Sequence, residues 1–385
     1  MTNRPFGSAR GRRQAGFSLV EIMVGVVIGV VALLAIAQTV VVFDRHTQST
    51  SSGGEAQMAG TLAMFNLERD IKQAGLGFGT ADAPTMGCTV RAEEPAVARS
   101  FDFPLTPVRI DLGATGSPDT VQVLYGDSSF FVTAERFDSP TPTSKRLVRR
   151  GGFRAGDVAV IAGNSSASAA SATCQLVEIT ADSDPTGFVT HGTGAYVSSY
   201  SAASAVPRFN PSTGTGSVFT TVGGTLYNLG PRPQLNTWAV NGRMLTRTDA
   251  FRGTGPVEVS EGVVNLKAQY GTDADGDDRI ADAEWTTAAP TNWNRVLAVR
   301  LAVLVRGRQF ERSADPSASA PIPVTTAVPT WSAGNAAPFA MTDVGGGATD
   351  SFAGTPDRSD PANWRFYRYR VYERVIPLRN TIWGQ

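Results

Sequence analysis

The chain has 385 residues, 42% hydrophobic and 18% charged, so it has enough apolar material for a core and is not globally disordered. Its 34 basic and 34 acidic residues cancel, which excludes a chain-wide basic field that would recruit nucleic acid. Two Cys and two His are too few for a Cys/His zinc cluster or an iron–sulfur scaffold within one chain. The 40 Gly and 23 Pro favour a turn-rich, β-rich body.

A long apolar run near the N-terminus is the most informative segment. Residues 1–16 contain four Arg and no acid, and Ile22–Ala37 contains no polar side chain. A helix over 17–43 would be about 40 Å long, enough to cross a hydrocarbon core of about 30 Å with its N-terminus in the cytoplasm. The alternative, a secretory signal peptide, fits poorly because the small residues Ala15 and Gly16 precede the run.

Glu21 lies inside this run, where a carboxylate is unfavourable unless it meets a partner charge. The segment Gly16-Phe17-Ser18-Leu19-Val20-Glu21 resembles the class III signal of type IV prepilins. The resemblance implies a leader over 1–16, cleavage by prepilin peptidase between Gly16 and Phe17, and N-methylation of Phe17. It also implies that Glu21 acts in assembly, because pairing with the amino terminus of a neighbouring subunit would define register.

A second helical stretch follows the apolar run. Apolar residues recur at Met58, Leu62, Phe65 and Ile71, so residues 44–77 are expected to continue the N-terminal helix. The Ser, Thr and Gly content of 44–54 predicts a weakened or broken helix near 51–54, and Gly75 and Gly77 predict its end near Ala74.

From residue 78 to 385 the pattern indicates a β-rich globular domain on the periplasmic or extracellular side. Apolar and polar residues alternate over Val264–Tyr270 and most clearly over Arg295–Arg306. The expected fold is α+β: a long N-terminal helix, membrane-spanning in its first half, packed on one face of an antiparallel β-sheet with long loops. Stretches rich in small residues predict insertions near 198–224 and 313–362.

Further segments resemble the PilW-type minor pilins. They are Leu67–Ile71, Glu261–Leu266, Gln269–Gly271, Val299–Leu301 and Pro377–Asn380. The resemblance implies a low-abundance subunit acting in type IV pilus assembly near the tip. The implied partners are other minor pilins, the major pilin, prepilin peptidase and the inner-membrane assembly machinery. The body would be periplasmic before assembly and at the cell surface in the pilus afterwards.

The two cysteines, Cys88 and Cys174, are expected to form a disulfide if the body lies in an oxidising compartment; the alternative is two buried thiols.

The acidic stretch 273–284 has the spacing of a calcium-binding loop. The candidate ligands are Asp273, Asp275, Asp277, the Arg279 carbonyl and Glu284. Asp278 stands where such loops carry Gly, and the flanks look like strands. The alternative is a solvated acidic turn, so Ca²⁺ is a possible cofactor only.

The sequence offers little for catalysis. His46 and His191 are expected to be surface histidines, and Gly345–Gly347 lacks the Lys-Ser/Thr of a phosphate-binding loop. We therefore expect no enzyme activity. Two alternatives to a minor pilin stay open: a type II secretion pseudopilin, and a membrane-tethered periplasmic binding module or enzyme.

Overall fold

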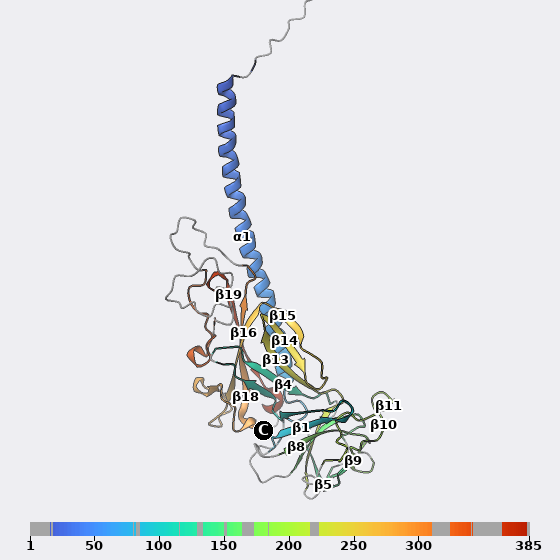
Figure 1. The fold of residues 1–385 in the computed structure, drawn as a ribbon. Coiled ribbons are helices and arrows are strands. Elements are labelled where there is room, and N and C mark those ends of the chain that lie inside the picture. Colours follow the sequence, from blue (N-terminus) through green and yellow to red (C-terminus); the bar gives the residue numbers. More distant parts are fainter. Residues whose placement is uncertain are drawn as a thin grey trace, which may run out of the picture. The chain divides into compact units, whose positions relative to one another are not determined.

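The computed structural model describes residues 16, 18–79, 81, 85–114, 116–128, 134–149, 152–163, 173–183, 185–215, 223–309, 324–339, 341 and 364–382. The leader up to residue 15, Phe17 and most of the expected insertion at 313–362 lie outside them. The chain divides into two compact units, Met1–Ser52 and Gly53–Gln385. Helix α1 (Leu19–Gln73) begins in the first unit and ends in the second (Figure 1).

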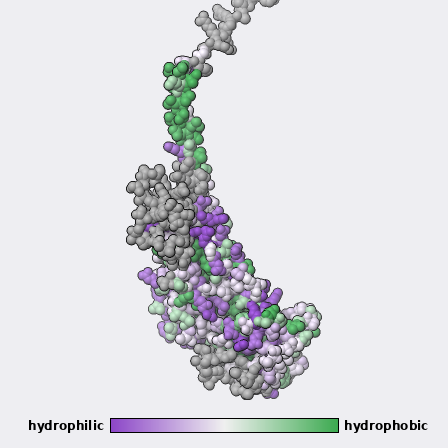
Figure 2. Space-filling view, viewed as in Figure 1, coloured by the Kyte–Doolittle hydropathy of each residue, from purple (hydrophilic) through white to green (hydrophobic). Residues whose placement is uncertain are grey.

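The first unit contains the apolar part of α1. Residues Leu19–Val40 are long and apolar enough to cross a membrane, judged by length and composition, and none of this span is buried in the protein. Figure 2 shows it as a continuous hydrophobic surface. A helix that is apolar on every side is typical of a segment that lies in lipid or among other apolar helices.

The expected break of α1 near residues 51–54 is wrong, because the helix is continuous from Leu19 to Gln73. Gly53 and Gly54 each cost about 1 kcal/mol relative to Ala, but unlike Pro they keep the N–H group. The Thr47 hydroxyl donates to the carbonyl of Phe43 at 3.0 Å, a bond made within the helix. The composition therefore lowers helix propensity without interrupting the backbone hydrogen bonds.

In the second unit, α1 buries one face against the body. The buried positions follow helical spacing and include Ala56, Ala63, Leu67, Ile71 and Ala74. The helix ends where Gly75 adopts a φ of 81° and donates its N–H to the carbonyl of Leu124. The predicted end near Ala74 is confirmed.

One sheet has the order β17 (Trp285–Thr286), β16 (Val263–Thr272), β18 (Val296–Arg306), β19 (Tyr369–Pro377), all antiparallel. The alternation seen in the sequence is present, but both faces of β16 are covered. Lys267 is buried because its ammonium contacts the carboxylate of Asp119 at 2.9 Å, and Asn265 donates to the carbonyl of Gly116. The polar residues of β16 are therefore buried together with its apolar ones, which the alternation alone did not predict.

A second sheet has the order β15 (Val257–Glu261), β14 (Met244–Asp249), β13 (Gln234–Asn241), β4 (Thr120–Tyr125), β3 (Val108–Asp111), also antiparallel. Side chains of α1 and of these two sheets form one hydrophobic core. This core holds the second half of the helix to the body.

The largest sheet has eight strands. Its order is β2 (Arg99–Pro104), β1 (Thr89–Glu94), β8 (Thr173–Glu178), β7 (Val158–Gly163), β12 (Gly224–Gly230), β5 (Glu135–Pro140), β6 (Ser144–Leu147), β9 (Phe188–Thr190). Among the described strand pairs of this sheet, the β1–β8 pair alone is parallel. Hydrophobic clusters cover both faces of β7 and β8. The fold is thus α+β as expected, with several largely antiparallel sheets where a single one was predicted.

Smaller elements complete the described chain. A hairpin joins β10 (Tyr196–Val197) to β11 (Ser204–Ala205), and α3 spans Arg379–Ile382. Short 3₁₀ helices occupy Pro95–Val97, Asp282–Glu284, Trp293–Arg295, Gly334–Ala336 and Trp364–Phe366. Within the expected insertion at 198–224, Phe209 and Asn210 are buried, so part of that segment packs on the body.

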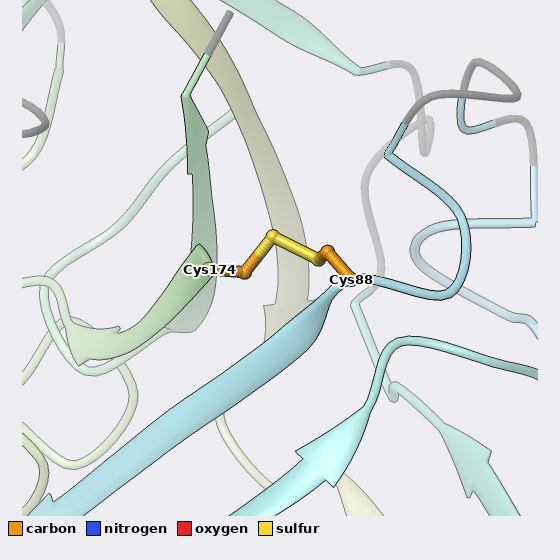
Figure 3. Close-up of a disulfide and its surroundings, with 2 residues drawn as sticks. All are labelled: Cys88 and Cys174. Carbon is orange, nitrogen blue, oxygen red and sulfur yellow. A yellow bond between two sulfur atoms is a disulfide. The ribbon is translucent and has the colours of Figure 1, made fainter. Parts of the chain in front are cut away.

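Cys88 and Cys174 form the predicted disulfide (Figure 3). Cys88 immediately precedes β1, and Cys174 lies in β8 opposite Val90. Both are buried in the core on one face of the eight-stranded sheet, with their Cα atoms 6.1 Å apart. The bond therefore fastens the one parallel strand pair of this sheet.

Candidate functional site

The N-terminal motif lies at the start of α1. The carbonyl of Ser18 accepts from the N–H groups of Glu21 and Ile22 at 2.9 and 3.1 Å, which forms the first helical turn. Glu21 is exposed there, beside the exposed side chains of Leu19 and Val20. Among the described residues, its carboxylate has no hydrogen-bond or ion-pair partner. Phe17, where cleavage and methylation are expected, lies outside the described residues.

A buried carboxylate fixes the other end of α1 to the body. Asp70 accepts hydrogen bonds from the Tyr125 hydroxyl at 2.9 Å, from Asn236 Nδ2 at 2.9 Å and from Trp238 Nε1 at 2.8 Å. Asp70 is 1% exposed, so its three partners replace water. Burial and the neighbouring Asp70 raise the pKa of Tyr125 well above its usual value. The sequence does contain a signal for this site, an acid at a core-facing helical position.

The acidic loop 273–284 brings together three of its candidate ligands. Carboxylate oxygens of Asp273, Asp275 and Asp277 lie within 4.8 Å of one another. The φ of 60° at Asp278 shows that Asp can take the conformation for which such loops use Gly.

Asp273 is nevertheless already well paired. It is buried, accepts from the N–H groups of Gly276 and Asp277 at 2.7 and 3.1 Å, and contacts Arg295 Nη1 at 3.0 Å. Burial alone would raise the pKa of this carboxyl, but these hydrogen bonds outweigh burial and lower it. A cation would have to compete with the Arg295 guanidinium.

Glu284 does not join this group. Its carboxylate accepts from the N–H groups of Ala281 at 2.7 Å and Ala274 at 2.8 Å, and these two bonds lower its pKa. The backbone N–H of Arg279 donates to Asp277, and no contact places the Arg279 carbonyl in the group. The three Asp carboxylates suit Ca²⁺, while the carboxylate of Glu284 is bound to backbone N–H groups instead.

His191 is not the surface histidine expected from its Gly- and Thr-rich surroundings. It is 1% exposed, and its Nε2 lies 3.2 Å from the ammonium of Lys145. Burial, assisted by Lys145, lowers the pKa of His191 to about 3, and burial lowers the pKa of Lys145 to about 8. A ring so enclosed cannot reach a substrate. The side chain of His46 lies outside the described residues.

Comparison with known proteins gives two family matches. Residues 241–380 match the type IV pilus-assembly protein W, and residues 11–37 match the prokaryotic N-terminal methylation motif. No curated protein matches the chain. Among solved structures, it is similar to the type IV-like pilin TTHA1219 from Thermus thermophilus, with 9% identity and a TM-score of 0.29. That match covers 83% of this chain and 94% of the other, and a TM-score this low does not place individual residues.

The two family matches cover the two parts that the structure joins through α1. The methylation motif matches the start of the helix, and the second match covers the four-stranded sheet onto which the end of the helix packs. The chain therefore contains a region similar to the type IV pilus-assembly protein W family, PilW, and carries a prepilin-type methylation motif at its N-terminus.

Proposed function

We propose that this protein is a minor pilin, a low-abundance subunit that contributes to type IV pilus assembly near the tip, together with other minor pilins and the major pilin. The observation that carries the proposal is that the two halves of α1 have different surroundings. One continuous helix exposes an apolar span in its first half and contributes to the core of the body in its second. Such a helix can be held by the inner membrane before assembly and by the helices of other subunits afterwards.

Processing by prepilin peptidase is the first step of the proposed function. Cleavage between Gly16 and Phe17 would remove the four leader arginines and keep the whole apolar span. The body would stay anchored, with a new amino group at Phe17 that becomes N-methylated.

Glu21 would direct the anchored subunit into the filament. A carboxylate at the centre of a membrane helix costs about 2.5–3.5 kcal/mol and less near an end. Pairing with the amino terminus of a neighbouring subunit would offset this cost, and because both charges must meet, it would set the register between subunits. The inner-membrane assembly machinery would then extract the subunit from the bilayer.

A recruitment experiment tests the proposal. Glu21→Ala should leave the full-length protein in the inner membrane but reduce its amount in sheared pili at least tenfold. Glu55→Ala is the matched control, because Glu55 is an exposed acid on the same helix outside the apolar span. Recruitment of Glu21→Ala at the control level would contradict the assembly role.

Deleting the gene separates the proposal from its alternatives. Loss of surface pili with normal protein secretion supports a minor pilin. Loss of secretion with normal piliation would instead support a type II secretion pseudopilin. If neither changes, the body would be a tethered binding module or enzyme whose leader serves only for export.

A further inference from the structure

A cavity of about 390 Å³ opens beside the eight-stranded sheet. It lies where β7 begins and β8 ends, and loops around residues 206–209, 231–234 and 251–252 enclose it. We call it the arginine pocket and define it by Val206, Arg208, Phe209, Arg232, Phe251 and Arg252. Its volume is in the range of small-ligand sites, at the lower end.

The three arginines are held in place by carboxylates. The ion pairs are Arg208–Glu94 at 2.6 Å, Arg232–Asp127 at 3.4 Å and Arg252–Asp249 at 3.2 Å. The contact given for each pair joins one guanidinium nitrogen to one carboxylate oxygen, whereas a guanidinium carries five N–H donors. Donors are therefore left over at the pocket on side chains that are already positioned.

The carboxylates lie behind the guanidinium groups. Within each pair the carboxylate is the less exposed side chain: 4% for Glu94 against 42% for Arg208, 8% for Asp249 against 64% for Arg252, and 32% for Asp127 against 81% for Arg232. A molecule that enters from solvent meets the cationic groups first. This arrangement favours an anion, since a charge-assisted hydrogen bond to arginine is stronger than a neutral one.

One acid, Glu178, also lines the pocket, but both its oxygens are occupied. The backbone N–H of Arg208 donates to Oε2 at 2.7 Å, and the Tyr196 hydroxyl donates to Oε1. The Asn210 side chain accepts from the backbone N–H of Glu178 at 2.7 Å and donates to the carbonyl of Glu178 at 2.8 Å. These bonds pin the loop that carries Arg208 to the end of β8, so the pocket is built before any ligand arrives.

The remaining surface of the pocket is apolar. Phe209 and Phe251 are buried and pack edge to face, with ring centroids 5.9 Å apart. Val206, which is exposed, and two prolines of the 231–234 loop complete the wall. A charged ligand without an apolar part would leave these apolar side chains in contact with water.

We propose that the arginine pocket binds a small ligand that carries a carboxylate on a body about the size of one ring. The carboxylate contacts the free N–H groups of Arg232 and Arg252, and the ring lies against Phe209, Phe251 and Val206. An acidic sugar and an aromatic acid share this chemistry. The proposal does not depend on the role of the protein in the pilus.

Binding to the full-length protein in detergent tests the proposal, by titration calorimetry and saturation-transfer NMR at pH 7. The probes are glucuronate and phenylacetate, with glucose and phenylacetamide as uncharged controls and inorganic phosphate as an anion without a ring. For ligands of this size the expected Kd of the better acid is on the order of 1 mM. The two acids distinguish a sugar ligand from an aromatic one.

The double variant Arg232→Gln/Arg252→Gln should weaken binding at least tenfold. Arg146→Gln is the control, because Arg146 is an exposed, ion-paired arginine on β6 and does not line the pocket. Val206→Trp should also weaken binding by filling the pocket mouth without removing charge. The proposal is overturned if neither acid binds at 20-fold the expected Kd, if phosphate binds as well as the acids, or if the double variant binds unchanged.

Discussion

Replacing Asp70 with alanine should destabilise the body by about 2–5 kcal/mol. The substitution removes the acceptor of Trp238 Nε1 and of the Tyr125 hydroxyl, whereas Asn236 Nδ2 keeps a contact of 3.3 Å with Tyr125 Oη. A buried donor left without a partner costs about 1–3 kcal/mol, and two such donors give about 2–6 kcal/mol. Removing a buried charge returns part of this cost.

Urea denaturation of the full-length protein in detergent, followed by tryptophan fluorescence, measures this change. Trp238, one of the six tryptophans that contribute to this signal, lies at the site. Asp70→Asn keeps one acceptor oxygen and should cost about half as much as Asp70→Ala. Arg69→Ala is the control, because this neighbouring side chain is exposed and should change stability by less than about 0.5 kcal/mol. A cost for Asp70→Ala no larger than that of the control would refute the role assigned to these hydrogen bonds.

Three further predictions follow from the described contacts. Removing the disulfide with Cys88→Ala/Cys174→Ala should cost about 4–5 kcal/mol for a loop of this length, measured by the same denaturation; a loss below about 1 kcal/mol would contradict it. Because His191 has a folded pKa of about 3 and an ordinary value of 6.5, the unfolded chain takes up a proton that the folded chain excludes, so stability should fall from pH 6.5 towards pH 3. His191→Gln should flatten that slope, and an unchanged slope would show that other groups cause it. If the acidic loop binds Ca²⁺, calorimetry should show a Kd of roughly 10⁻⁴–10⁻³ M that Asp273→Ala abolishes and Arg295→Gln tightens; no heat at several millimolar calcium would leave a solvated turn.

Local patterns predicted the elements that depend on local rules. The end of α1 was predictable because Gly75 and Gly77 follow the last core-facing helical position. The strands β16 and β18 were predictable because their alternation has a period of two. The disulfide followed from the compartment that the leader implies and from the presence of only two cysteines.

Contacts between distant segments could not be predicted in the same way. The polar face of β16 was evident, but nothing in its pattern shows that the segment around Asp119, 148 residues away from Lys267, covers it. The continuous helix was missed because Gly lowers helix propensity without removing a hydrogen-bond donor.

Both sites first seen in the structure also join segments far apart in the chain. Asp70 meets Trp238 across 168 residues, and the arginine pocket combines three loops, around residues 206–209, 231–234 and 251–252. His191 was misjudged because a Gly- and Thr-rich segment usually lies on a surface, whereas here the strand pairing of β6 and β9 brings Lys145 against the ring. The composition of a segment indicates its own preferences but does not identify the distant segments that pack against it.

The mass of the mature N-terminus tests the central claim most directly. We expect intact-protein and peptide mass spectrometry of the protein from its native membrane to show a chain that begins at Phe17 and carries one additional methyl group. In cells without prepilin peptidase the same chain should keep residues 1–16. A mature chain that begins after Ala37 would contradict the pilin account, because the apolar span would then be a signal peptide that is removed.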